Sequence, residues 1–231
     1  MKSAFRVLVT IVLVSAALLP GAAPTAAGAQ VACFRILHAS PDAPNLDVYI
    51  NRTRVANNLA YAQFSARRWC IAATIMLARA FPANADPNVT LPLVSTNVEL
   101  MVDRSYVIAI AHSVQELQVV PLENPAPPPV GQFSLRLANL AAGIGDLDLA
   151  ITGGSVWLFN VTFPTAQTTT QPAGAYALEV RQAGTPDVLI PLGSLRFRSR
   201  DRRTIYVLAP SDAARAQGAT AAPQFILEPD R

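Results

Sequence analysis

The sequence predicts an all-β protein of two tandem immunoglobulin-like, antiparallel β-sandwich domains that follow a signal peptide. Three observations predict this fold. Apolar and polar residues alternate with a period of two, short strand-like segments are separated by Pro, Gly, Asn and Asp, and the pattern occurs twice. The 231 residues are 52% apolar and 14% charged, which suits two domains with cores and excludes a mainly disordered chain.

Residues 1–29 are predicted to be a secretory signal peptide. Lys2 and Arg6 precede the apolar stretch Val7–Leu19, and small residues ending at Ala29 form the cleavage site. The apolar stretch is shorter than the roughly 20 residues that span a bilayer, although an uncleaved anchor is the alternative. We expect an exported mature chain, extracellular or associated with the cell envelope, without a transmembrane segment. The formal charge of +3 includes Lys2 and Arg6, so the mature chain is close to neutral and predicts no nucleic-acid partner.

Two copies of one unit follow the signal peptide. Cys33–His38 corresponds to Ser134–Asn139, and Leu46–Ile50 corresponds to Leu147–Ile151 at the same offset. The predicted domains comprise residues 30–123 and 131–231.

Residues 124–130 are rich in proline and predict a stiff, extended linker between the domains. The strands expected in the first domain are 33–38, 46–50, 54–59, 64–70, 74–80, 89–94, 97–101, 105–111 and 116–121.

A charged pair is predicted on the outer face of each domain. If the apolar residues of Leu46–Ile50 face the core, Asp47 points outward, and Arg35 does so on its own strand. The second copy repeats these residues as Arg136 and Asp148. We therefore predict cross-strand Arg35–Asp47 and Arg136–Asp148 pairs that set strand register, with a charged binding site as the alternative.

The first copy contains a specific motif, His38-Ala-Ser-Pro-Asp-Ala-Pro-Asn-Leu-Asp-Val-Tyr-Ile50. It resembles the secreted bacterial family called domain of unknown function 4397, whose repeats open with His-Ala-Ser-Pro-Asp-Ala-Pro followed by Asp-Val-Tyr. The second copy lacks this opening but has a later element of the family, Pro172-Ala-Gly-Ala-Tyr176. The resemblance covers residues 31–231. It implies an exported, often envelope-associated β-sandwich repeat protein and no particular activity.

His38, Ser40 and Asp42 are the nearest approach to a catalytic cluster. We interpret them as a turn stabilised by side-chain hydrogen bonds and prolines, with a ligand-contacting loop or a nucleophilic triad as alternatives. Asp42, Asn45 and Asp47 also offer oxygen ligands for calcium. Because no complete ligand loop follows, no metal and no other cofactor is expected.

Cys33 and Cys70 are the two cysteines of the chain. Both lie in the first copy, and an exported chain favours disulfides. We predict a Cys33–Cys70 disulfide, with two buried free thiols as the alternative.

Arg196, Arg198, Arg200 and Arg202 are predicted to share one face of a strand. We interpret this strip as a solvated edge strand protected by charge, and a site for an anionic ligand is the alternative.

The function predicted from the sequence is that of an exported, non-enzymatic binding or adhesion module. A cell-wall glycan, an anionic polymer or a surface protein is the expected partner. The alternatives are a structural spacer, in which the linker holds the two copies apart, and a hydrolase that uses the His38 loop.

Overall fold

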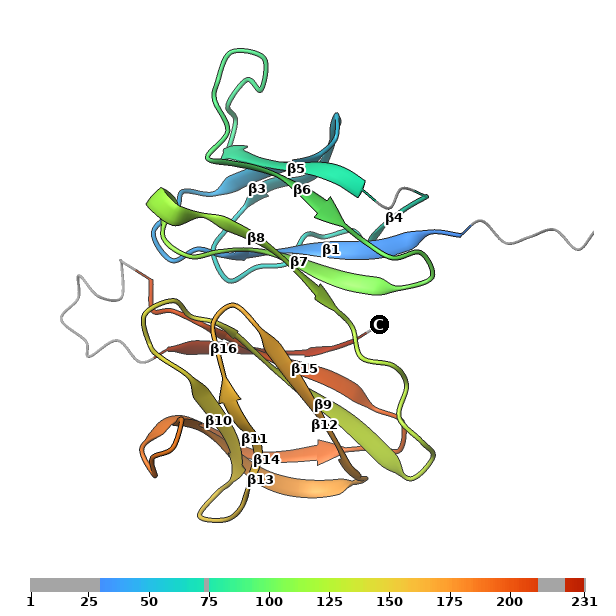
Figure 1. Cartoon of the computed structure of the whole chain (residues 1–231), viewed down its shortest axis with the longest axis vertical. Helices are drawn as coiled ribbons and strands as arrows, with labels where there is room; N and C mark the ends of the chain where they lie inside the picture. The colour runs from blue at the N-terminus through green and yellow to red at the C-terminus, as the bar shows by residue number, and fades with distance from the viewer. Residues whose placement is uncertain (1–29, 73–74, 212–222, 231) are drawn as a thin grey trace, which may run out of the picture.

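The structure is a computed structural model that describes residues 30–72, 75–211 and 223–230, so the predicted signal peptide lies outside the described residues. Two β-sandwiches are stacked one on the other (Figure 1). The predicted all-β class is confirmed. In the described part of the chain, the helical structure is a single 3-10 turn, Val114–Glu116, and no helix there has the length and apolar character needed to cross a membrane.

The first sandwich is formed by the strands between residues 32 and 123. These strands are β1 (Ala32–Ala39), β2 (Leu46–Ile50), β3 (Thr53–Leu59), β4 (Trp69–Ile71), β5 (Ile75–Pro82), β6 (Val94–Glu99), β7 (Ser105–Ala111) and β8 (Gln118–Glu123). One sheet has the order β4-β1-β7-β8, and the other has the order β3-β2-β5-β6.

The second sandwich is formed by the strands between residues 132 and 229. These strands are β9 (Gln132–Leu140), β10 (Leu147–Ile151), β11 (Val156–Val161), β12 (Ala166–Pro172), β13 (Gly174–Gln182), β14 (Val188–Phe197), β15 (Arg202–Leu208) and β16 (Gln224–Pro229). Its sheets have the orders β12-β9-β15-β16 and β11-β10-β13-β14, which repeat the arrangement of the first sandwich strand for strand.

Three details differ from the predicted strands. Each sandwich contains one parallel pair, β1 with β7 and β9 with β15, because the chain crosses to the other sheet and returns between them. The predicted strand 64–70 is reduced to β4 and an isolated bridge between Leu37 and Phe64. Residues 89–93 lie in a loop before β6 rather than in a strand.

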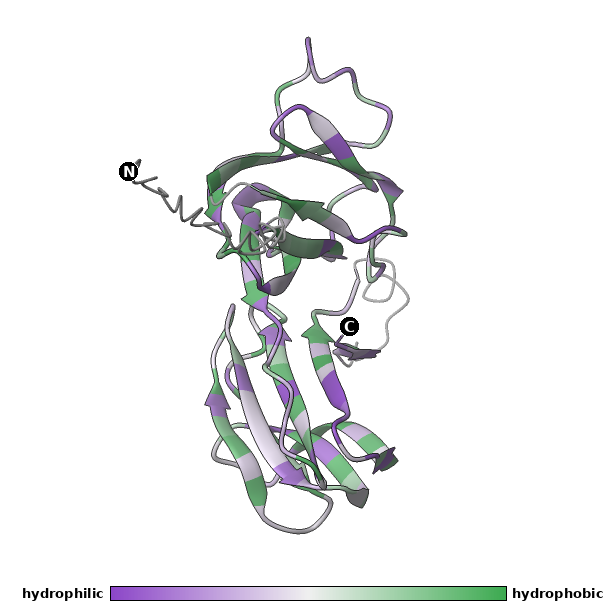
Figure 2. Cartoon of the chain, turned by 90° about the vertical axis from the view of Figure 1, so that its right-hand side faces the viewer, coloured by the Kyte–Doolittle hydropathy of each residue, from purple (hydrophilic) through white to green (hydrophobic). Residues whose placement is uncertain are grey.

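Each sandwich has its own apolar core, and apolar and polar residues alternate along its strands (Figure 2). In the first core, Phe34 and Ile36 of β1 pack against Val48 of β2. In the second, Leu135 and Leu137 of β9 pack in the same way. These inward positions follow the period-two pattern.

A third apolar cluster joins the two sandwiches. Leu37 of β1 and Val107 of β7 point away from the first core and meet Leu140 of β9 and Tyr206 of β15. The alternative in which residues 124–130 hold the two copies apart is therefore wrong. The β4-β1-β7-β8 sheet and the β12-β9-β15-β16 sheet both carry apolar side chains on their outer faces. These two faces pack against each other and are thereby removed from water.

Candidate functional site

Asp47 is a buried carboxylate that shapes the edge of the first sandwich. It accepts hydrogen bonds from the backbone N–H of Asn58 at 2.7 Å and of Asn84 at 3.3 Å, and Arg54 lies 3.4 Å away. Asn58 and Asn84 both have positive φ angles, 47° and 65°. The carboxylate thus fixes two backbone bends that an L-residue rarely adopts unaided.

Asp148 does the same work in the second sandwich. It accepts the backbone N–H of Asn160 at 2.8 Å and of Gly184 at 3.1 Å, and these residues also have positive φ angles. Asp47 and Asp148 therefore hold equivalent bends in the two copies.

The predicted Arg35–Asp47 and Arg136–Asp148 pairs are wrong. β1 and β2 belong to different sheets, as do β9 and β10, so the partners lie on opposite outer faces of each sandwich. The prediction that these residues point away from the core holds for all four. Backbone N–H groups cover Asp47 and Asp148, whereas the interface between the sandwiches covers Arg35 and Arg136. The alternation of apolar and polar residues does not predict this difference.

Arg35 and Arg136 both point into the interface between the sandwiches. Arg35 lies over the ring of Phe64, 4.6 Å from its centroid, and 3.9 Å from Glu228 of β16. Arg136 lies 3.5 Å from Asp230, and both side chains are almost fully buried. Each arginine thus pairs with a carboxylate of the C-terminal segment. The two carboxylates, Glu228 and Asp230, are two residues apart in the sequence.

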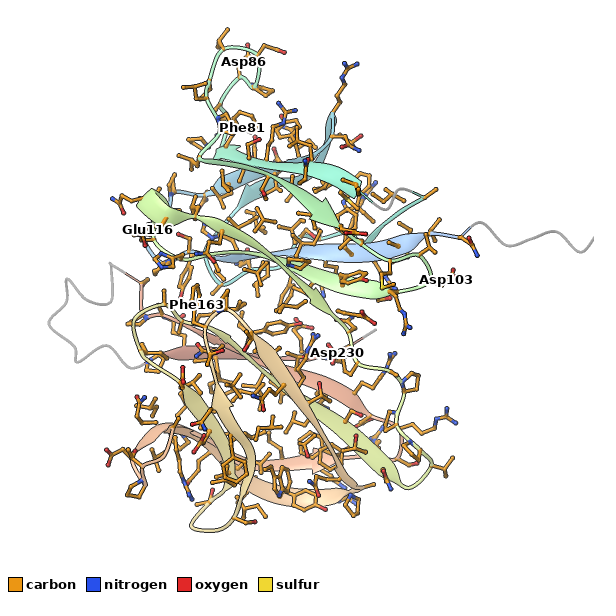
Figure 3. The ribbon with its side chains drawn as sticks, in the orientation of Figure 1. Phe81, Asp86, Asp103, Glu116, Phe163 and Asp230 are labelled. Carbon is orange, nitrogen blue, oxygen red and sulfur yellow. A yellow bond between two sulfur atoms is a disulfide. The ribbon has the colours of Figure 1, made fainter. Side chains whose placement is uncertain are left out.

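A buried polar network surrounds Arg136. Its guanidinium donates to Thr204 at 2.9 Å, to the Tyr206 hydroxyl at 3.2 Å and to the Glu123 carbonyl. Asp230, which lies between the sandwiches (Figure 3), accepts the Thr204 hydroxyl at 2.9 Å. Burial raises the pKa of Asp230 although Arg136 opposes the shift, and burial raises the pKa of Tyr206 to about 12. The network joins β9, β15, the end of β8 and the C-terminal residues.

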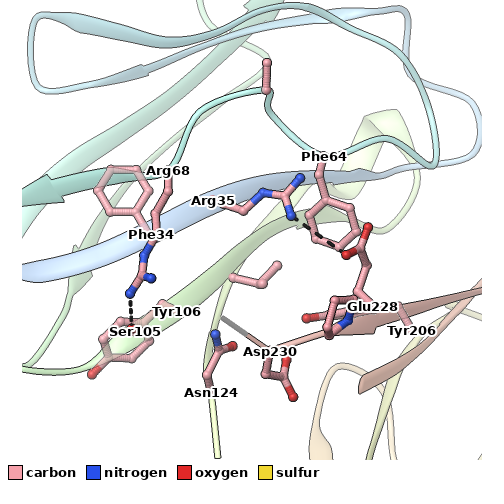
Figure 4. A pocket seen from close by; sticks show the side chains of 13 residues that line it. Phe34, Arg35, Phe64, Arg68, Ser105, Tyr106, Asn124, Tyr206, Glu228 and Asp230 are labelled. Atoms are coloured by element: carbon pink, nitrogen blue, oxygen red, sulfur yellow. Dashed lines mark hydrogen bonds and ion pairs between the residues drawn. The ribbon is translucent and has the colours of Figure 1, made fainter. Parts of the chain in front are cut away.

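A cleft of about 300 Å³, the interdomain cleft, opens beside this network. Figure 4 shows Arg35 and Glu228 reaching toward each other from the two sandwiches, and Arg68 donating to Ser105 on the opposite side. The lining contains two arginines and two carboxylates. The cleft is therefore balanced in charge, and its charged side chains already have partners within the protein.

A second and larger depression, of about 500 Å³, runs between β3 and the segment 63–69. We call it the β3 groove. It exists because the backbone leaves β1 after Ser65 and returns at Trp69. Between the Leu37–Phe64 bridge and the Phe34–Trp69 pair, this segment has four residues where β1 has two. In the second sandwich, β12 stays paired with β9 over its whole length.

Ser65 stabilises this detour. Its hydroxyl accepts the backbone N–H of Ile36 at 3.0 Å and donates to the Arg67 carbonyl at 3.0 Å, while its own N–H donates to the Ile36 carbonyl. A side-chain oxygen thus replaces a missing backbone partner.

The Cys33–Cys70 disulfide is present, as predicted, and fixes the far end of the same segment. The two cysteines are directly opposite each other in the β1–β4 pair.

The β3 groove displays polar side chains that the rest of the described structure leaves unused. Asn57, Gln63 and Arg67 are exposed, and their side chains have no hydrogen-bond or ion-pair partner among the described residues. Trp69 is half-buried and donates its indole N–H to the Val55 carbonyl at 2.9 Å, which holds its ring in place. None of the described residues that line the groove is acidic.

Backbone bulges in β3 help to aim the side chain of Asn57, which lies in this strand. The register between β2 and β3 shifts twice, on either side of the Val48–Ala56 pair. Bulges of this kind turn an edge strand away from further pairing and redirect its side chains.

His38 is fully buried in the turn that follows β1. Its Nε2 lies 3.0 Å from the Pro44 carbonyl and its Nδ1 3.3 Å from the Ser40 N–H, so both ring nitrogens face backbone groups. The Ser40 hydroxyl donates to Asp42 and not to the imidazole. Burial lowers the pKa of His38, against the opposing effect of the Pro44 hydrogen bond. The side chains of His38 and Ser40 thus form hydrogen bonds within the turn itself.

Asp42 and Asp47 accept hydrogen bonds from different parts of the backbone. Asp42 accepts the N–H of Val114 at 2.9 Å, whereas Asp47 accepts the N–H of Asn58. Asp42 and Asp47, two of the three oxygen ligands considered for calcium, are thus engaged with separate backbone groups. No group of three His, Cys, Asp or Glu side chains suited to a metal ion occurs in residues 30–72, 75–211 and 223–230.

The arginine strip is not one strand, which corrects the prediction for Arg196, Arg198, Arg200 and Arg202. β14 ends at Phe197 and β15 begins at Arg202, so Arg196 lies in β14, Arg198 and Arg200 lie on the connection between the two sheets, and Arg202 begins β15. Asp201 makes the turn, accepting the N–H of Arg198 at 2.9 Å. Arg202 donates to the carbonyl of Pro125 in the linker.

The alternation pattern did not reveal the β3 groove. Asn57 and Arg67 stand in the predicted strands 54–59 and 64–70, and Gln63 lies between these strands. The extra residues between Phe64 and Trp69 become visible only when the pairing with β1 is known. The absence of acidic residues between positions 48 and 85 is the one sequence feature that could have indicated this cationic surface.

Fold and site together define a protein of two packed β-sandwiches with a cationic, amide-lined groove on the first. Residues 32–150 match the family described as Domain of unknown function (DUF4397), and because this span exceeds half of the chain, the chain belongs to that family. The match runs from β1 through β10, and so ends well before residue 231. Comparison with curated proteins finds no match.

Among solved structures, the chain is similar to the Bacillus anthracis TIE protein, with 9% identity and a TM-score of 0.26. The similarity covers 78% of this chain and 34% of that one, so the chain spans about a third of that protein's length.

Proposed function

We propose that the protein is a non-catalytic binding protein of the cell envelope or the extracellular space, and that the β3 groove binds an acidic glycan. The carrying observation is the set of unpartnered polar side chains, Asn57, Gln63 and Arg67, in a groove without acidic lining residues. Binding sites of this kind combine concave shape with a few convergent polar groups.

The side chains match the chemistry of such a ligand. Amides of Asn57 and Gln63 both donate and accept hydrogen bonds, which suits sugar hydroxyls. The guanidinium of Arg67 suits a carboxylate, with which it forms short, charge-assisted hydrogen bonds. Trp69 offers a fixed apolar surface at the end of the groove.

Support for a non-catalytic role comes from the His38 turn, in which both ring nitrogens and the Ser40 hydroxyl are engaged with other groups. Support for export comes from the disulfide, because disulfides persist in oxidising compartments.

The test is isothermal titration calorimetry of the mature chain with an oligosaccharide of uronic acids, compared with a neutral oligosaccharide of equal length. The uronic-acid chain should bind, and Arg67→Ala should weaken its binding about tenfold, which corresponds to about 1.4 kcal/mol. Arg196→Ala is the matched control because Arg196 is exposed on the other sandwich. Equal weakening by both variants, or no binding of the uronic-acid chain, would overturn the proposal.

A further inference from the structure

β12 is an unprotected edge strand. It is the outer strand of the β12-β9-β15-β16 sheet and pairs with β9 without a register shift. It contains no charged residue, and its proline is the last of its residues. Of the other edge strands in the described sandwiches, β4 is three residues long, β3, β11 and β14 are bulged, β8 and β16 have a proline or a charge within the strand, and β6 ends on the charged Glu99. Such features normally prevent edge-to-edge pairing.

The pairing with β9 fixes which backbone groups β12 leaves free. Asn139 donates its N–H to the Thr165 carbonyl, and Ala173 donates its N–H to the Gly131 carbonyl. In an antiparallel ladder the bonded positions alternate, so Gln167, Thr169 and Gln171 direct their N–H and C=O groups toward β9. Thr168 and Thr170 direct theirs to the open edge, where both residues are exposed.

The sequence of β12 is self-complementary. Gln167-Thr-Thr-Thr-Gln171 reads the same in both directions about Thr169. Two copies placed antiparallel about a two-fold axis at Thr169 would bring Thr168 opposite Thr170 and Gln167 opposite Gln171. This register also places the free backbone groups of Thr168 and Thr170 opposite each other.

We propose that β12 pairs with β12 of a second copy of this chain, so that the two four-stranded sheets join into one across a two-fold axis. The interface is isologous, as is usual for homodimers. Thr168 exchanges two backbone hydrogen bonds with Thr170 of the second copy, and the threonine hydroxyls and glutamine amides pair across the strands. The uncharged edge is therefore an interface and not an unprotected surface.

Phe159 adds apolar area beside this edge. Phe159 is 59% exposed, and its backbone carbonyl accepts the side-chain amide of Gln167 at 3.1 Å, which places it next to the first half of β12. An exposed aromatic residue beside a free strand edge is typical of an interface.

The oligomeric state of the mature chain, measured by sedimentation equilibrium, tests the proposal with two double variants. The wild-type chain should be a dimer that dissociates on dilution. Thr168→Lys/Thr170→Lys should be monomeric, because the lysines at 168 and 170 face each other across the axis. Thr168→Lys/Thr170→Glu should dimerise, since each lysine then faces a glutamate. A monomeric wild-type chain, or equal behaviour of the two variants, would overturn the proposal.

The register has its own test, because Cys33 and Cys70 are bonded and an introduced cysteine is the sole free thiol. Thr169→Cys should form an intermolecular disulfide under mild oxidation, because positions facing each other across the axis have Cα atoms about 4.5–5.5 Å apart. Thr168→Cys is the control, because two such cysteines lie diagonally, about 7–8 Å apart. Equal cross-linking of both variants would contradict the antiparallel register.

Discussion

Single side chains that replace backbone groups shape the β3 groove. The Ser65 hydroxyl bonds the N–H of Ile36 where the neighbouring strand has turned away, and Asp47 accepts the N–H of Asn58 where β3 bulges. The two accepting residues, Ser65 and Asp47, are both buried. The groove thus depends on a few residues whose side chains satisfy backbone donors that regular pairing would otherwise satisfy.

Ser65→Ala should lower the free energy of unfolding by about 1–3 kcal/mol, because it leaves the buried N–H of Ile36 without an acceptor. Urea denaturation measures the change. Ser194→Ala, at an exposed position of β14, is the control and should leave stability nearly unchanged. A loss for Ser65→Ala no larger than that of the control would contradict the assigned role.

His38 should make stability depend on pH. Its pKa in the folded chain lies below the ordinary 6.5 because burial disfavours the charged ring. As the pH falls, the unfolded chain takes up the proton first. The stability contributed by neutral His38 is therefore complete above about pH 6.5 and is lost as the pH falls toward the lowered pKa.

Urea denaturation between pH 8 and pH 5 should show this loss for the wild-type chain and a flatter profile for His38→Asn. Parallel profiles for the two proteins would contradict the effect of burial on His38.

At the scale of elements, the segment from Phe64 to Ile71 is the feature that distinguishes the first sandwich from the second. It is held at one end by the Leu37–Phe64 bridge and at the other by β4 and the disulfide. Its counterpart β12 is a regular edge strand. One topological position thus forms the wall of a groove in one copy and a free edge in the other.

The disulfide should contribute substantially to the stability of the first sandwich. Its cysteines are 37 residues apart, and closing a loop of this length stabilises by roughly 3–4 kcal/mol in the chain-entropy model. Cys33→Ala/Cys70→Ala should lose about that much in urea denaturation and should no longer respond to reductant. Unchanged stability in the double variant would show that the disulfide constrains little.

The local pattern predicts most strands but not what meets their outer faces. Alternation correctly places Phe34 and Ile36 in the core, and the spacing of the two copies matches the shared topology. It could not show that Asp47 is covered by the loop of Asn84, or that Arg136 is covered by the other sandwich. Such contacts depend on packing between sheets distant in sequence. The detour at Ser65 similarly depends on pairing with β1.

At the scale of the whole molecule, the two sandwiches are packed as one body. The apolar cluster between them includes Leu37 and Leu140, and the buried Arg136–Asp230 pair lies beside it. The first residue of the linker takes part, since Arg136 donates to the side-chain carbonyl of Asn124 at 3.2 Å. We therefore expect the sandwiches to hold a fixed relative orientation, which keeps the β3 groove and β12 at fixed positions.

Asp230→Ala should destabilise the protein by about 3–5 kcal/mol, because it leaves the buried guanidinium of Arg136 without its counter-ion. Glu228→Ala is the matched control on the same end of the chain: its partner Arg35 is partly exposed and 3.9 Å away, so the loss should be about 0–1 kcal/mol. Differential scanning calorimetry compares the two. Similar losses for both variants would contradict the buried network.

The fluorescence of Trp69 tests most directly whether the β3 groove is the binding site. The chain has two tryptophans, so Trp157→Phe leaves Trp69 as the sole reporter at the groove. Titration of this variant with a uronic-acid oligosaccharide should give a saturable change in emission that Arg67→Ala shifts to about tenfold higher concentration. Binding detected by calorimetry without any change in Trp69 emission would place the site elsewhere and contradict the account.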